Sequence, residues 1–325
     1  MRIVVAAALL LALPAAPLSA QAARSISASD KAVGAEAHPQ LLAKFGGPYR
    51  GPQAAYVERV GKRIALQSGL SNASNDFTVT LLDSPLENAF AIPGGYVYVT
   101  RQLLALMNSE AELAAVMGHE IGHVAARHAT KRSTRSTVGS LAAAVLGAVT
   151  KSDLVGRAAG VGAQLYALGY SRNQEYEADS LGVRYIARAG YTPHALADIL
   201  TALNNETQLE AAIAGRSGSA PTWMSTHPNG AERVSRAERL AAATGRPDLT
   251  RTQDVAYLRM LDGLAFDDGG KVVRIVAARP GDTVETLAAR MAYPDRRVER
   301  FAVLNSLDPE APLRPGRLVK LVVAR

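Results

Sequence analysis

The chain has 325 residues, of which 48% are hydrophobic, and this is enough for one large packed domain and a small second one. The absence of cysteine excludes a disulfide-stapled fold, a cysteine nucleophile, cysteine-bound zinc and a lipid anchor on a lipobox cysteine. The net charge of +7 is spread along the chain, so we expect weak attraction to anionic envelope surfaces and no nucleic-acid binding.

Residues 1–22 have the pattern of a cleavable secretory signal peptide. A positive Arg2 precedes a short apolar run at residues 3–13, and either Ala20 or Ala22 suits the cleavage site. The run is too short to span a bilayer comfortably, although an uncleaved anchor is the alternative. The alanine-rich style is typical of bacteria, so we expect the mature protein in the periplasm.

A helix and a small sheet are predicted next. Residues 53–67 have a helical pattern, and alternating apolar side chains predict a strand over residues 77–82. Residues 89–92 and 96–100 form the arms of a hairpin, and Pro93 in its turn suits an edge strand.

The first arm of this hairpin is a candidate substrate-binding edge. An exposed edge can pair with an extended peptide backbone. Unless the hairpin is purely structural, we expect this pairing to involve the following residues: Asn88, Ala89, Phe90, Ala91 and Ile92.

The central motif is a His-Glu-x-x-His sequence in a predicted helix that begins with the capping pair Ser109 and Glu112. His119 and His123 are four residues apart, so they lie on one helical face. Two neutral imidazoles at that spacing can bind one Zn²⁺. Glu120 is placed to act on a water molecule there. We therefore predict His119 and His123 as zinc ligands and Glu120 as the catalytic base.

Two further expectations follow from the surroundings of this motif. Gly118 and Gly122 indicate that another segment packs closely against the helix. The helical pattern continues to Arg132, and on one continuous helix His128 would lie opposite His119. We therefore expect His128 at the surface and not among the metal ligands.

A catalytic zinc needs a third protein ligand and an open position. A second predicted helix carries Glu175 and Asp179 four residues apart on one face. We predict Glu175 as the third ligand and Asp179 as the acceptor for the second N–H of a ligand imidazole. Glu177 points elsewhere, and we expect it in solvent.

Residues 138–169, between the two metal motifs, are apolar with few charges. Each apolar run is too short to cross a bilayer as a straight helix. We expect a helical hairpin over the site that contacts membrane or substrate, or else a buried core hairpin.

His227 precedes a proline in a loop of small residues. It could donate to the oxyanion, orient substrate, occupy the fourth zinc position, or be an ordinary loop residue. We slightly favour closure of the site by His227 over oxyanion stabilisation. Arg233, on the next helix, is expected to connect this loop to the acidic helix.

The chain resembles the zinc metallopeptidases that include HtpX, BepA and the CAAX prenyl proteases. The resemblance covers residues 34–240 and rests on four ordered motifs: residues 88–95, His119-Glu120-x-x-His123, Ser171-Arg172-x-x-Glu175-x-x-Ala178-Asp179, and Thr226-His227-Pro228 followed by Arg233. It implies a zincin-like domain over residues 34–243, substrate pairing with the edge strand, and quality control of misfolded or stalled envelope proteins.

The composition changes after residue 243. Residues 244–270 are predicted as a linker and residues 271–325 as a separate small β-α-α-β unit. Pro280-Gly281-Asp282-Thr283, Leu304-Asn305 and Pro315-Gly316 make this unit resemble a LysM module, which binds glycans such as peptidoglycan. A degenerate module that only packs on the protease is the alternative.

These features predict an α+β, mainly α, periplasmic endopeptidase with one Zn²⁺ per subunit and unfolded or misassembled envelope proteins as substrates. One alternative is a zinc-dependent peptidoglycan hydrolase targeted by the tail. The other is an envelope chaperone or binding protein that keeps only the fold.

Overall fold

The computed structural model describes most of the chain: residues 25–70, 73–133, 170–214, 223, 227, 231–248 and 253–325. The expected signal peptide and the apolar segment at residues 138–169 lie outside the described residues. Within the described residues, no helix has the length and apolarity that a bilayer span requires.

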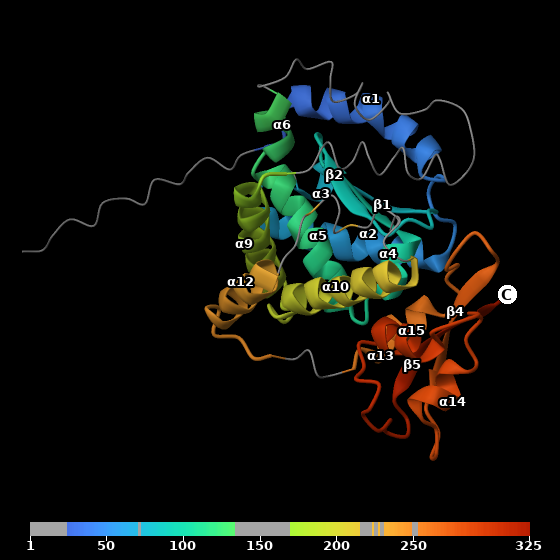
Figure 1. Ribbon diagram of the computed structural model, residues 1–325. Coiled ribbons are helices and arrows are strands. Elements are labelled where there is room, and N and C mark those ends of the chain that lie inside the picture. Colours follow the sequence, from blue (N-terminus) through green and yellow to red (C-terminus); the bar gives the residue numbers. More distant parts are fainter. Residues whose placement is uncertain are drawn as a thin grey trace, which may run out of the picture.

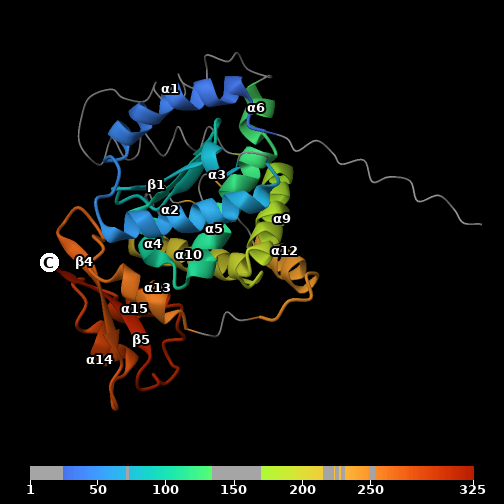
Figure 2. The same cartoon turned by 180° about the vertical axis from the view of Figure 1, so that it is seen from behind.

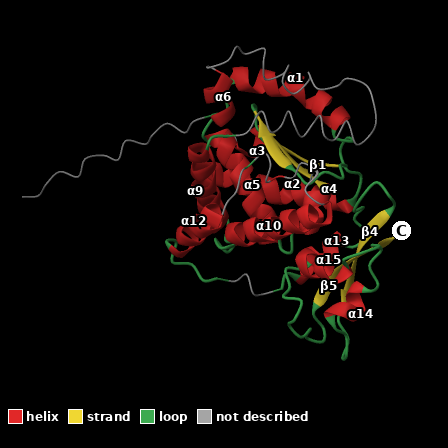
Figure 3. Ribbon diagram, in the orientation of Figure 1, coloured by secondary structure: helices red, strands yellow, loops and turns green. Residues whose placement is uncertain are grey.

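A three-stranded sheet lies beside the central helices (Figures 1 and 3). Its strands are β1 (Thr78–Leu82), β2 (Ala89–Ile92) and β3 (Tyr96–Thr100), in the order β1-β3-β2. β3 pairs in parallel with β1 and antiparallel with β2. Gly94 and Gly95 form the hairpin turn with positive φ angles of 90° and 86°, which glycine adopts without strain. The predicted hairpin and the edge position of β2 are confirmed.

Helix α5 (Glu110–Ala125) runs through the centre of the molecule (Figure 1). Ser109 caps its first turn by accepting a hydrogen bond from the backbone N–H of Glu112. Its neighbours include α2 (Pro52–Ala65), α9 (Arg172–Arg188) and α10 (Ala195–Ala214). Mainly apolar side chains from these helices and from the sheet form the core.

The glycines of α5 allow α9 to pack closely against it. A Cβ atom at Gly118 would lie 3.2 Å from the Cα of Gly182. A Cβ at Gly122 would lie 3.0 Å from the carbonyl oxygen of Ala178. The predicted close packing is therefore confirmed, and it brings the two metal motifs face to face.

Helix α1 (Ala28–Lys44) lies across one end of the molecule, over the sheet hairpin and beside α6 (His128–Ser133), in both views (Figures 1 and 2). Leu41 and the C-cap Phe45 pack with Phe90 and Tyr98 in a second apolar cluster. The other short elements are α3 (Ala73–Asp76), α4 (Arg101–Leu106), α12 (Ala231–Ala242) and the 3₁₀ turn η1 (Leu66–Ser68).

The helix that carries the His-Glu-x-x-His motif ends earlier than predicted. Arg127 adopts a left-handed backbone conformation with φ of 56°, and it separates α5 from α6. The chain therefore turns back, and His128 is fully buried. The expectation of a surface His128 was wrong, because it assumed one continuous helix.

The C-terminal unit has the predicted order of elements. It contains β4 (Lys271–Ala277), α14 (Val284–Ala288), α15 (Arg297–Leu304) and β5 (Leu318–Ala324), and it follows the short helix α13 (Val255–Leu261). β4 and β5 pair antiparallel. Thr283 caps α14 in a capping box with Thr286. The likeness to a LysM module and the domain boundaries stay predictions.

This unit packs firmly on the rest of the chain. Apolar residues from β4, α15 and β5 belong to the same core cluster as those of α2 and α5. On the preceding helix α13, the hydroxyl of Tyr257 also donates to the carbonyl of Leu104 at 3.0 Å. Lys320 is fully buried and donates to three carbonyl oxygens at the end of α4, those of Ala105, Leu106 and Met107, at 2.8–2.9 Å.

Candidate metal centre

Four buried side chains converge at the face between α5 and α9. They are His119, His123, Glu175 and His227, and one ligand atom from each lies within 4.8 Å of all the others. The Nε2 atoms of His119 and His123 are 3.0 Å apart. Nδ1 of His227 lies 3.1 Å from Nε2 of His119 and 3.1 Å from a carboxylate oxygen of Glu175.

Hydrogen bonds on the far side of each imidazole fix which nitrogen faces the centre. Nδ1 of His119 donates to the carboxylate of Asp179 at 2.9 Å, so Nε2 presents a lone pair inward. Nδ1 of His123 lies 2.8 Å from Nδ1 of His128, whose Nε2 lies 3.1 Å from Glu177. Donation along this chain toward the carboxylate leaves Nε2 of His123 with an inward lone pair as well.

This arrangement fits a tetrahedral metal ion. Two lone pairs that face each other at 3.0 Å repel unless a cation lies between them. Bonds of about 2.0–2.1 Å in a tetrahedral zinc site place the ligand atoms roughly 3.3–3.4 Å apart. Five of the six pairs of these residues approach to 3.0–3.5 Å here, including 3.4 and 3.5 Å from the imidazoles to Glu175, and all four ligand atoms lie within 4.8 Å of one another. The donor set of imidazoles and one carboxylate is the kind that zinc prefers.

The carboxylates of Glu175 and Asp179 favour positive charge at the centre, which a proton on His119 can supply or a metal ion can supply in its place. Burial would raise the pKa of Glu175, but the charge of His227 and hydrogen bonds from His119 and His227 hold it below its usual value. Burial would lower the pKa of His119, but hydrogen bonds to Asp179 and Glu175 raise it to about 9. Burial and the charge of His119 hold the pKa of His123 well below its usual value.

Arg233 joins three parts of the centre. Its guanidinium donates twice to Asp179, at 2.7 and 2.9 Å, and lies 3.0 Å from Glu175. It also donates to the carbonyl of His227 at 3.1 Å. Burial by itself would lower the pKa of Arg233, but Asp179 and Glu175 raise it. Arg233 thus connects the His227 segment to the acidic helix α9.

Glu120, which follows His119 in the sequence, is fully buried. Its Oε1 accepts a hydrogen bond from the indole of Trp223 at 3.0 Å and lies 3.5 Å from Nε2 of His227. Its Oε2 has no hydrogen-bond partner among the described residues. A buried carboxylate oxygen without a donor is costly, so this atom is suited to accept a hydrogen bond from water or substrate.

Sequence reasoning missed three side chains that contact the centre. Trp223 packs on His227 with ring centroids 4.9 Å apart, and Tyr170 stacks on His123 at 3.8 Å. His128 contacts His123 directly. One available clue was that Trp223, which lies four residues before His227, is the only tryptophan of the chain. Glu177 is exposed as expected, although it also contacts His128.

The predicted edge strand lies beside this centre. Asn88, Ala89 and Phe90 are buried, whereas Ala91 and Ile92 are half-buried. Ala91 and Ile92 line the same cavity as His123.

Comparison with known proteins identifies the family. A sequence profile described as Peptidase family M48 matches residues 52–241, which is more than half of the chain and includes α5, α9 and Arg233. The chain belongs to peptidase family M48. Members of this family depend on zinc, in agreement with the predicted cofactor and with the four ligand groups.

Several curated M48 relatives are similar over the same region. The mitochondrial metalloendopeptidase OMA1 of Schizosaccharomyces pombe is 32% identical over 64% of this chain and 60% of its own length. The beta-barrel assembly-enhancing protease of Escherichia coli is 28% identical over 66% of this chain and 44% of its own length. That of Yersinia pestis is 25% identical over 81% and 55%. The chain therefore spans about half the length of the curated relatives it matches.

Proposed function

We propose that this M48 chain is a zinc-dependent endopeptidase. The observation that carries the proposal is the buried cluster of His119, His123 and Glu175 with Glu120 directly beside it. These three residues would hold the zinc ion. When bound, zinc supplies Lewis-acid polarisation of the scissile carbonyl and acidifies the attacking water.

Glu120 supplies the acid–base chemistry. Its free Oε2 accepts a proton from the water that attacks the carbonyl carbon, and the carboxyl group then gives this proton to the leaving amine nitrogen as the C–N bond breaks. The hydrogen bond from Trp223 holds Oε1, so the carboxylate cannot rotate freely. Asp179 and Arg233 orient His119 and Glu175 from behind.

Substrate pairs in an extended conformation with β2. The strand is at the edge of its sheet, and Ala91 and Ile92 lie at the cavity that His123 also lines. Backbone hydrogen bonds at such an edge bind any extended peptide, which suits unfolded segments of many sequences.

His227 closes the site when no substrate is present. Its Nδ1 lies 3.1 Å from the ligand atoms of His119 and Glu175, so it would occupy the fourth position on a bound zinc ion in place of the attacking water, and its Nε2 lies 3.5 Å from Glu120. Arg233 and Trp223 hold it there. Entry of a substrate would move His227 aside. The rival role, donation to the oxyanion, needs a neutral or charged N–H directed at the carbonyl oxygen.

We also propose that the protein acts in the bacterial periplasm on misfolded or stalled envelope proteins. The amino-terminal sequence supports secretion. The similarity to beta-barrel assembly-enhancing proteases supports an envelope substrate. Contacts with peptidoglycan through residues 271–325, or with membrane through residues 138–169, remain part of this proposal.

The test is a comparison of wild type with Glu120→Gln, a variant that keeps the shape of the side chain but cannot accept the proton. Both are loaded with zinc and incubated with unfolded casein or with purified peptidoglycan, and the products are identified by mass spectrometry. Cleaved casein from wild type alone supports the proposal. Soluble glycan or stem-peptide fragments would favour the cell-wall hydrolase. Intact casein and intact peptidoglycan with both proteins would favour a non-catalytic envelope chaperone.

A further inference from the structure

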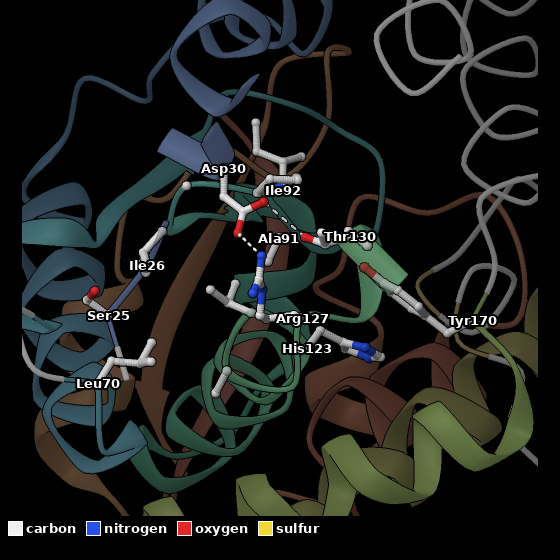
Figure 4. A pocket seen from close by; sticks show the side chains of 15 residues that line it. Ser25, Ile26, Asp30, Leu70, Ala91, Ile92, His123, Arg127, Thr130 and Tyr170 are labelled. Atoms are coloured by element: carbon white, nitrogen blue, oxygen red, sulfur yellow. Dashed lines mark hydrogen bonds and ion pairs between the residues drawn. The ribbon is translucent and has the colours of Figure 1, made fainter. Parts of the chain in front are cut away.

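A cavity of about 160 Å³ lies beside His123, between parts of the chain that are far apart in sequence. Residues ahead of α1 form one wall, β2 and its turn form the second, and the corner between α5 and α6 forms the third (Figure 4). Ile26 and Leu70 lie on one side of this view and Tyr170 on the other.

The amino-terminal wall is held in place by polar contacts at its rim. Asp30 accepts hydrogen bonds from Arg127 at 3.2 Å and from Thr130 at 3.0 Å, as the dashed lines in Figure 4 mark. Lys31 forms an ion pair with Asp76 at 2.8 Å. Gly34 of α1 packs so closely on the hairpin turn that a Cβ atom would lie 2.1 Å from the carbonyl oxygen of Pro93.

Eight of the fifteen residues that line the cavity carry apolar side chains, and the polar side chains of Asp30, Arg127 and Thr130 bind one another at its rim. The guanidinium of Arg127 donates to Asp30, and the aliphatic part of the Arg127 side chain adds apolar surface to the cavity between Leu70 and Tyr170. Ile26 is only 8% exposed, while Leu70 and Val124 are half-buried at the lining. An engineered apolar cavity of about 150 Å³ binds benzene, so this cavity has room for a large apolar side chain.

We propose that this cavity is the subsite for an apolar side chain, such as that of leucine or phenylalanine, next to the bond that is cleaved. The inference rests on the proposed peptidase function. His123 contributes one nitrogen to the metal centre while its ring borders the cavity, so a residue seated there lies adjacent to the reacting carbonyl. Because β2 is an edge strand and its residues Ala91 and Ile92 line the cavity, a peptide paired with β2 would lie beside the cavity. Ile26 and Leu70 set the size limit.

The proposal is tested by mapping cleavage sites in a peptide library with wild type, Ile26→Ala and Leu70→Ala. Wild type should prefer leucine or phenylalanine over alanine at one position flanking the cleaved bond by roughly tenfold or more. Both substitutions enlarge the cavity and should shift that preference toward tryptophan. Leu66→Ala, four residues before Leu70, removes an exposed side chain that does not line the cavity and should leave the preference unchanged.

A second measurement separates this proposal from the proposed catalysis. Fluorescent peptides that differ at one position are titrated into zinc-loaded Glu120→Gln and into the same variant carrying Leu70→Ala. Tighter binding of the leucine peptide than of the alanine peptide, with a difference in affinity that Leu70→Ala changes, supports the subsite even if no peptide is cleaved. The proposal would be overturned if wild type, Ile26→Ala and Leu70→Ala cleaved peptides with the same residue preference. A preference of the wild type for a charged residue at this position would also overturn it.

Discussion

Replacing Lys320 by methionine should lower the free energy of unfolding by about 3 kcal/mol, because it removes three buried hydrogen bonds. Lys320 is fully buried and is the donor to three carbonyl oxygens of the α4 end. Each net hydrogen bond contributes about 1 kcal/mol, so the three together contribute about 3 kcal/mol. Methionine keeps the apolar stem but leaves these buried acceptors without the ammonium, and it removes the positive charge near Glu112.

The assay is urea unfolding of the full chain at pH 7, followed by circular dichroism. Lys271→Met is the matched control, because Lys271 is partly exposed and makes an ion pair with Asp267 within its own segment. Such a pair contributes about 0–1 kcal/mol. If Lys320→Met lowered the free energy of unfolding by less than about 1 kcal/mol, as the control does, Lys320 would not stabilise the packing of the C-terminal unit against α4.

Burial lowers the pKa of Lys320 to about 7, against a usual value of 10.5. Between these pH values the unfolded chain binds more protons than the folded chain, so the stability of wild type relative to Lys320→Met should increase as pH rises from about 7 to 10. Urea unfolding of both proteins across this range measures the difference in the free energy of unfolding, and a decrease with pH would contradict the prediction. His227→Ala should raise the basal rate of casein cleavage, whereas a fall of about 100-fold would assign His227 to the oxyanion and an unchanged rate would remove both roles. Asp179→Asn should weaken zinc binding by about 10–100-fold in a chelator competition, while Glu238→Gln, at the surface, should leave it unchanged.

The parts of the centre that lie on regular helices were predictable from spacing. His119 and His123 are one turn apart, and so are Glu175 and Asp179, because the helical repeat fixes which side chains share a face. Gly118 and Gly122 further indicated that a second helix approaches closely. These local rules are sufficient to predict the pairing of the two motifs without knowledge of the tertiary structure.

The parts that depend on one backbone angle or on distant contacts were not predictable in this way. The left-handed conformation of Arg127 returns His128 to the centre, and arginine gives no local indication of such a turn. A lysine in a strand is normally solvated, yet the ammonium of Lys320 donates to three carbonyl oxygens at the end of a helix that lies more than 200 residues earlier in the sequence. Trp223 and Tyr170 reach the imidazoles only through the tertiary fold.

The most direct test of the proposed metal centre is anomalous diffraction at the zinc edge from crystals of the zinc-loaded wild-type protein. We predict one peak per chain, surrounded by Nε2 of His119, Nε2 of His123, a carboxylate oxygen of Glu175 and Nδ1 of His227. Zinc bound at other side chains, or casein cleavage by metal-free protein, would contradict it.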